Sequence, residues 1–207
     1  GTEGEGDYEW GPFITVKEGL FLKSVSTNKR EFSLGETVTL NLITEGEGTP
    51  AKVRYLIQDG NWQEIESIET TGTTLQYTPA MGGDFYVEVI MTNDKGIQYF
   101  TDVYFSVYAG LRPVELKASD VFVSIGDSIK FTPVLKGEGT ATKVVYSIQN
   151  ADYSYHEDFQ GTVEGFVWTP TVCGTYYCDV ALTNDLGYTY SAFSQEVTVL
   201  GQGLTVL

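Results

Sequence analysis

Apolar and polar residues alternate with a period of two along most of this chain. The apolar members of three such runs are Val38, Leu40 and Leu42, then Val53, Tyr55 and Ile57, then Phe85, Val87, Val89 and Met91. Strands with one buried face have this pattern. Turn signals such as Asp59-Gly60 and Gly82-Gly83 separate the runs, and long helical periodicity is absent. The pattern predicts an all-β protein made of short antiparallel strands.

The sequence also repeats itself at a shift of about 91 residues, without a gap. Loop 46–49 (Gly-Glu-Gly-Thr) recurs at 137–140, and the Thr-Asn-Asp-x-Gly turn at 92–96 recurs at 183–187. Roughly a third of the positions between residues 34 and 99 match their partners, which indicates a duplication. Seven or so strands in each copy of about 90 residues predict two tandem β-sandwiches. The predicted parts are an acidic tail with a short lead-in strand (1–19), a first sandwich (20–109) and a second sandwich (110–207).

The two ends of the sequence resemble pieces of further copies. Residues 13–16 align with 104–107, the predicted last strand of the first copy, and residues 203–207 resemble the start of another copy. The chain is therefore either two units of a longer array or a pair with a short lead-in strand and a frayed end. Because residue 1 is Gly rather than Met, we expect a processed chain or a piece of a longer gene product.

The net charge of the chain argues against several classes of binding partner. Twelve Lys and Arg against 28 Asp and Glu give a net charge of −16, and the pI is about 4.2. Nucleic acids and anionic membranes need a cationic protein face, so neither is an expected partner. No run of 18 apolar residues is present, so no membrane span is expected. Two Cys and one His are too few for a structural zinc site or a disulfide framework.

Two sequence segments resemble those of known protein families. Residues 174–178 (Gly-Thr-Tyr-Tyr-Cys) are similar to the G-x-Y-x-C strand of immunoglobulin domains, and residues 83–96 resemble bacterial Ig-like, PKD-like and triple-tyrosine modules. The resemblance implies two tandem Ig-like antiparallel β-sandwiches and a tyrosine corner at Tyr176, whose place Phe85 takes in the first copy. It also implies an extracellular protein of the bacterial cell surface or periplasm, with a lipid anchor possible upstream.

Catalytic chemistry has little support in the sequence. By alternation Cys178 faces the core, while Cys173 lies in the turn before it, so two free thiols are predicted. His156 is the only imidazole, and we expect it to be a surface or half-buried structural residue. No nucleophile elbow, phosphate loop or dinucleotide motif is present, and the acidic residues fall mostly on outward strand positions and loops. We therefore expect no enzymatic activity.

Acidic loops form the first candidate site. In an Ig-like sandwich the two repeated loops lie at the same end, which would bring Glu47 near Asp94 and Glu138 near Asp185. Clustered carboxylates and backbone carbonyls suit calcium, which is the one cofactor the sequence suggests. The alternative is turn chemistry alone, with Asn and Asp in Asx-turns and Gly at positive φ.

Aromatic residues form the second candidate site. Trp62 follows the turn at 59–61, Tyr153 aligns with Trp62, and Tyr155 is two residues further on. Such rings in a loop could stack on a sugar face, and the alternative is that they cover a sandwich edge or pack on the neighbouring domain.

Three functions remain open at this stage. The leading hypothesis is a non-enzymatic extracellular module of a bacterial surface protein that serves cell adhesion or acts as a spacer. The alternative is a carbohydrate-binding accessory module of a surface glycan-handling protein, and a third possibility is a fragment of an enzyme whose catalytic domain lies elsewhere in the gene. The expected partner is an unknown protein or glycan at the cell surface.

Overall fold

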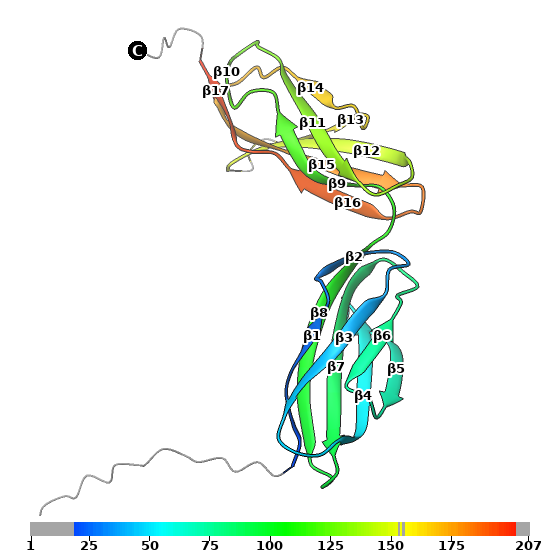
Figure 1. Ribbon diagram of the computed structural model, residues 1–207. Coiled ribbons are helices and arrows are strands. Elements are labelled where there is room, and N and C mark those ends of the chain that lie inside the picture. Colours follow the sequence, from blue (N-terminus) through cyan, green and yellow to red (C-terminus); the bar gives the residue numbers. More distant parts are fainter. Residues whose placement is uncertain (1–18, 153, 155, 202–207) are drawn as a thin grey trace, which may run out of the picture. The chain divides into compact units, whose positions relative to one another are not determined.

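The computed structural model describes residues 19–152, 154 and 156–201, and every helix or strand among them is a β-strand (Figure 1). Within this part of the chain, no helix has the length and apolar character that crossing a membrane requires. The predicted lead-in strand at 13–16 and the segment at 203–207 lie outside the described residues.

The first sandwich packs a three-stranded sheet, in the order β1-β3-β6, against a five-stranded sheet, in the order β2-β8-β7-β4-β5. Its strands are β1 (Phe21–Thr27), β2 (Glu31–Ser33), β3 (Val38–Glu45), β4 (Pro50–Asp59), β5 (Glu64–Thr70), β6 (Thr74–Tyr77), β7 (Gly83–Asn93) and β8 (Gln98–Tyr108). The short strand β2 pairs in parallel with the end of β8, whereas β1 and β3 pair in the antiparallel sense.

The second sandwich repeats this topology with one interruption. Its strands are β9 (Arg112–Ala118), β10 (Phe122–Ser124), β11 (Ile129–Lys136), β12 (Ala141–Asn150), β13 (His156–Gln160), β14 (Phe166–Trp168), β15 (Gly174–Asn184), β16 (Thr189–Phe193) and β17 (Val197–Leu200). One sheet has the order β14-β11-β9, and the other has the order β10-β17-β15-β12-β13 with β16 also paired to β15. The strand equivalent to β8 is therefore divided into β16 and β17.

The period-two pattern explains which side chains form the two cores. In β4 and its copy β12, the inward positions include Tyr55 and Tyr146, both fully buried, and their neighbours alternate outward. In β15 the inward positions run from Tyr176 through Cys178 to Leu182. The fold class that the sequence predicts, two tandem Ig-like antiparallel sandwiches, is confirmed.

A buried asparagine closes one end of each sandwich. The side-chain amide of Asn93 donates to the carbonyl oxygen of Leu20 at 3.1 Å, while its oxygen accepts the backbone N–H groups of Lys95 and Ile97. Asn184 repeats the arrangement in the second copy and donates to the carbonyl oxygens of Ala109 and Leu111, at 2.6 and 3.2 Å. The Asn of the predicted Asx-turn therefore ties the turn to the start of the first strand in its own sandwich.

Pro133 weakens pairing along one side of β11. In the first copy the equivalent Leu42 donates its N–H to the carbonyl oxygen of Thr73 at 2.8 Å, and Pro133 has no N–H to do so. The pairing of β14 with β11 covers only Ile129 to Phe131, and the register with β9 shifts between Val134 and Leu135. The first copy has the same shift at the equivalent positions, between Ile43 and Thr44, without a proline, so this irregularity does not come from Pro133. Pro133 itself pairs regularly with Leu116 in the central strand of its sheet, so the bulge or edge strand that the sequence predicts at Pro133 is wrong.

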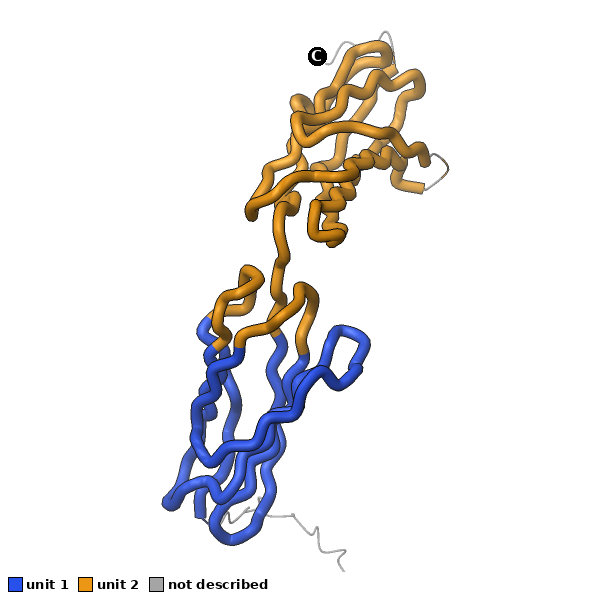
Figure 2. The backbone as a smooth tube through the Cα atoms, turned by 90° about the vertical axis from the view of Figure 1, so that its right-hand side faces the viewer, with its two compact units in different colours: residues 1–28, 39–77, 86–104 blue, residues 29–38, 78–85, 105–207 orange. Residues whose placement is uncertain are grey.

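The described chain divides into two compact units, coloured separately in Figure 2. One contains residues up to 28, with 39–77 and 86–104, and the other contains 29–38, 78–85 and the described residues from 105 onward. The sequence boundary between residues 109 and 110 stays a prediction.

The tyrosine corner implied for the second copy is present. The hydroxyl of Tyr176 donates to the carbonyl oxygen of Val172 at 3.1 Å. Phe85 takes this position in the first copy and has no hydroxyl to donate, so the corner hydrogen bond belongs to the second sandwich.

The equivalent core tyrosines differ in the same way. Tyr146 donates its hydroxyl to the carbonyl oxygen of Thr162 at 2.8 Å, whereas the hydroxyl of Tyr55 is buried without a partner. Burial raises the pKa of each to about 12. The two sandwiches thus bury an equivalent tyrosine, with a hydrogen bond from its hydroxyl in the second copy and without one in the first.

We expect Tyr146→Phe to destabilise the second sandwich by about 1 kcal/mol, because Thr162 loses its donor. Tyr55→Phe is expected to be neutral or stabilising, because it removes a buried hydroxyl that has no partner. Differential scanning calorimetry of the whole chain checks both, since about 1 kcal/mol shifts the Tm of a domain this size by roughly 4–8 °C. Equal losses in the two variants would contradict this account.

Candidate functional site

Trp62 is held in a tight turn between β4 and β5. One carboxylate oxygen of Asp59 accepts the backbone N–H groups of Asn61 and Gln63, both at 2.9 Å, and Trp62 donates its own N–H to the carbonyl oxygen of Asp59. This network places Trp62 at a φ of 63°, the only positive φ of a non-glycine among the described residues. An L side chain in this region costs roughly 1–2 kcal/mol, so the turn is strained at the tryptophan.

The indole of Trp62 is 61% exposed and packs on the ring of Tyr86, with the centroids 4.4 Å apart and the planes at 58°. Tyr86 points outward from β7. Burial first, and then the charge of Asp102 on β8, raise the pKa of Tyr86. Phe100 and Tyr104 lie two residues to either side of Asp102 on the same strand, and each is 62% exposed. Trp62 contacts Tyr86, and Phe100 and Tyr104 stand at outward positions of the neighbouring strand with Asp102 between them; we call these four residues the aromatic face.

The predicted aromatic partners in the second copy, Tyr153 and Tyr155, lie outside the described residues. Their role as ligand-binding residues stays a prediction. Sequence reasoning found Trp62 but missed Phe100 and Tyr104, although both stand at outward positions of a strand whose inward positions are apolar. An aromatic residue at an outward strand position is the signal that would have found them.

The repeated loops do lie together at one end of each sandwich. A Cβ added at Gly48 would be 3.5 Å from a carboxylate oxygen of Asp94, and in the second copy Asp185 accepts both the N–H and the hydroxyl of Thr140, at 3.2 and 3.4 Å. Glu47 and Glu138 are exposed beside them. Across the described ranges, no group of three or more His, Cys, Asp or Glu is arranged to hold a metal ion. Calcium binding at these loops remains a hypothesis.

We expect Asp185→Ala to lower the Tm of the second sandwich by about 4 °C, because the loop at Thr140 loses its acceptor. Addition of EDTA to the unchanged chain is expected to leave both transitions where they are. Thermal unfolding with calcium and then with EDTA checks this. A rise in Tm with calcium that Asp185→Ala abolishes would instead establish the calcium site.

The thiols and the histidine occupy the environments that the sequence predicts. Cys178 is fully buried and Cys173 is exposed, and both are free thiols. Burial, with a smaller effect of Asp179, raises the pKa of Cys178, so it is an inert core residue. His156 is exposed and lies 3.0 Å from a carboxylate oxygen of Asp158.

Among the described residues, Asp179 is the carboxylate with a buried oxygen that has no hydrogen-bond partner. It is half-buried on β15, and one of its oxygens is buried without a hydrogen-bond partner. Burial first, and then the charge of Asp158, raise the pKa of Asp179. Asp158 accepts a hydrogen bond from the hydroxyl of Ser147 at 2.6 Å, and this hydrogen bond is the main reason why the pKa of Asp158 is lowered.

We expect Asp179→Asn to raise the Tm by about 4 °C at pH 7. The raised pKa means that the folded chain holds the Asp179 proton more tightly than the unfolded chain does. The protonated Asp179 therefore stabilises the fold at a pH below the pKa that Asp179 has in the unfolded chain. This contribution is lost as the pH rises through the pKa that Asp179 has in the folded chain. The advantage of the variant should shrink as the pH falls toward about 3.9, the ordinary pKa of Asp. Calorimetry between pH 3 and pH 7 checks this, and a constant difference would contradict it.

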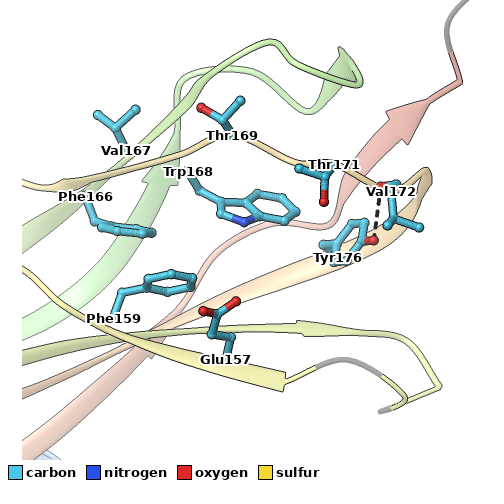
Figure 3. Close-up of a pocket in the computed structure, with 9 residues that line it drawn as sticks. All are labelled: Glu157, Phe159, Phe166, Val167, Trp168, Thr169, Thr171, Val172 and Tyr176. Carbon is cyan, nitrogen blue, oxygen red and sulfur yellow. Dashed lines mark hydrogen bonds between the residues drawn. The ribbon is translucent and has the colours of Figure 1, made fainter.

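A second aromatic cluster, which the sequence analysis missed, lines a pocket of about 440 Å³ in the second sandwich (Figure 3). Phe159, Phe166, Trp168 and Tyr176 contribute rings, and Glu157 contributes a carboxylate. The signal available in the sequence was the difference between the copies, because the positions of Phe159 and Phe166 are Ile68 and Leu75 in the first copy.

No protein-family model matches the sequence, and no curated protein matches it either. Several solved structures show some likeness at low identity. The fibronectin(III)-like modules of Clostridium thermocellum CbhA are 15% identical, with a TM-score of 0.35, over 88% of this chain and 97% of that one. The D0-D1 domain of intimin is 15% identical, with a TM-score of 0.34, over 86% of this chain and 98% of that one. A 1.5-MDa bacterial ice-binding adhesin is 13% identical, with a TM-score of 0.32, over 90% of this chain and 66% of that one.

Proposed function

We propose that this chain is a non-enzymatic adhesion module of an extracellular bacterial surface protein, of the Ig-like or triple-tyrosine type that the sequence resembles. The observation that carries the proposal is the aromatic face of the first sandwich. Three of its rings, those of Trp62, Phe100 and Tyr104, are each more than 60% exposed. Several large exposed aromatic side chains on one outer face are typical of sites of macromolecular contact, and aromatic residues dominate the energetics of such contacts.

The strain at Trp62 supports a role in binding. A glycine would adopt the φ of 63° without cost, yet the position holds the largest side chain and exposes it. Strained residues cluster at binding sites, where the surrounding structure holds them in place. The ring planes of Trp62 and Tyr86 are tilted by 58°, so the two rings present an uneven surface rather than a flat one. An uneven surface favours a protein partner over a stacked sugar ring, so the carbohydrate-binding module is the second candidate.

The test is binding of the labelled whole chain to an array of secreted and cell-surface proteins and, in parallel, to a glycan array. We expect saturable binding to at least one protein, weakened at least about 10-fold by Trp62→Gly, because an aromatic anchor at the centre of an interface contributes about 2 kcal/mol or more. Trp62→Gly should keep its Tm, since relief of the strain offsets the lost ring contact.

The matched control is Phe193→Ala, which removes an equally exposed ring (64%) from the second sandwich and should leave binding unchanged. A glycan signal that depends on Trp62 would move the function to carbohydrate binding. No signal on either array would contradict adhesion through this face and favour the spacer function.

A further inference from the structure

Carboxylates stand among the rings of the aromatic face. Asp102 occupies the outward position of β8 between Phe100 and Tyr104. Glu88 points outward from β7, two residues after Tyr86. Residues two apart along a strand lie about 7 Å apart on the same side of the sheet, so Asp102 has an exposed ring on either side. Burial first, and then the charges of Asp102 and Glu88, raise the pKa of Tyr86, so both carboxylates lie close to its hydroxyl.

The protein itself does not neutralise these two carboxylates. Strands β7 and β8 contain no Lys or Arg. Among the described residues, neither Asp102 nor Glu88 takes part in an ion pair. The neighbouring strand β4 carries Lys52 and Arg54, which form a salt bridge at 2.6 Å and a hydrogen bond at 3.0 Å with side chains of β5. The hydroxyl of Tyr86 is uncharged at pH 7, so both negative charges remain available to a partner.

Core packing does not account for the rings beside Asp102. Phe100 and Tyr104 are each 62% exposed and stand on the side of β8 that faces away from the buried residues. The second copy folds without this combination. There, Ser191 takes the position of Phe100, and Phe193 takes the position of Asp102. The fold therefore does not require exposed rings with a carboxylate between them.

Exposed rings and carboxylates on one surface suit a cationic partner. Ring faces attract cations through their quadrupoles, and a carboxylate at the same site adds a charge-assisted hydrogen bond. The planar guanidinium of arginine stacks on a ring and offers the N–H groups of its edge to a carboxylate, whereas the ammonium of lysine is a compact charge that does not stack. An acidic partner surface would be repelled, both by these carboxylates and by the net charge of −16.

We propose that the partner of the aromatic face is a protein surface that carries arginine side chains. A guanidinium stacks on the ring of Phe100 or Tyr104 and pairs with Asp102. Glu88 adds a second negative charge, and Trp62 supplies apolar contact area. This inference rests on the adhesion function proposed above and names the class of partner for that function.

The test titrates the whole chain with an arginine peptide and with its uncharged isostere, at constant ionic strength. The probe is acetyl-Arg-Gly-Gly-Gly-Arg-amide, whose arginines have the sequence spacing of Phe100 and Tyr104, and the comparison peptide carries citrulline in place of both arginines. In ¹H–¹⁵N NMR spectra, the arginine peptide should shift the backbone N–H signals of Phe100, Asp102 and Tyr104 saturably. It should bind about 3- to 10-fold more tightly than the citrulline peptide. The indole N–H signal of Trp168, in the second sandwich, should not move.

Two variants and a matched control separate binding at this site from attraction to the net charge. Asp102→Asn should weaken binding of the arginine peptide about 3-fold and leave the citrulline peptide unchanged, because only the cation uses the charge. Phe100→Ser introduces the residue of the second copy and should weaken arginine binding about 2- to 5-fold with an unchanged Tm, because the ring is exposed. The control Glu164→Gln removes one negative charge from an exposed turn of the second sandwich and should have no effect.

Equal binding of the two peptides, or equal losses in Asp102→Asn and Glu164→Gln, would overturn the proposal. The protein array distinguishes this failure from a failure of the adhesion function. A protein whose binding depends on Trp62 but not on Asp102 would support adhesion and contradict an arginine-bearing partner. Arginine-dependent binding at residues 100–104 with no partner on the array would contradict adhesion and leave the preference for arginine standing.

Discussion

The buried asparagine at the end of β7 and of β15 is the constraint on which each sandwich depends. A primary amide that is 0% or 1% exposed needs hydrogen-bond partners inside the protein, and here it finds them by joining a turn to the chain at the start of the first strand in its sandwich. The same end is tight enough that a Cβ at Gly46 or Gly137 would collide with the carbonyl oxygen of Gly19 or Gly110. The repeated loops and their acidic residues take their positions from this closure.

Duplication leaves the cores alike and lets the surfaces diverge. The inward positions of β4 and β12 carry Val, Tyr and Ile in both copies, because a packed core tolerates little change in volume. Edge and outward positions carry no such restriction. The first copy accordingly has its aromatic residues on an outer sheet face, and the second has them in a pocket between sheet edges. Comparison of equivalent positions in the two copies therefore separates the residues that the core requires from those that differ at the surface.

Period-two alternation was sufficient to predict the strands and the buried Cys178, and turn residues indicated the Asx-turns, because these features depend on local sequence. The internal repeat added the prediction of two sandwiches. The site was only partly predictable. Trp62 could be found as a loop aromatic, but its positive φ follows from the hydrogen bonds of Asp59, and alternation does not report those. Phe159 and Phe166 look like ordinary core residues in sequence. Their exposure to a pocket depends on where the two sheet edges end, and alternation does not report this.

The arrangement of the aromatic groups bears on how such a module would bind. Rings with few rotatable bonds that are mounted on sheets lose little conformational entropy when they contact a partner. Trp62 goes further, because its turn bears backbone strain that the free protein already contains and that binding does not add. A surface module has no chemical step to accelerate, so preorganisation is the main means by which its fold can raise affinity. The rigid β-sandwich, with rings braced by one another and by a tyrosine corner, supplies this in both copies by different residues.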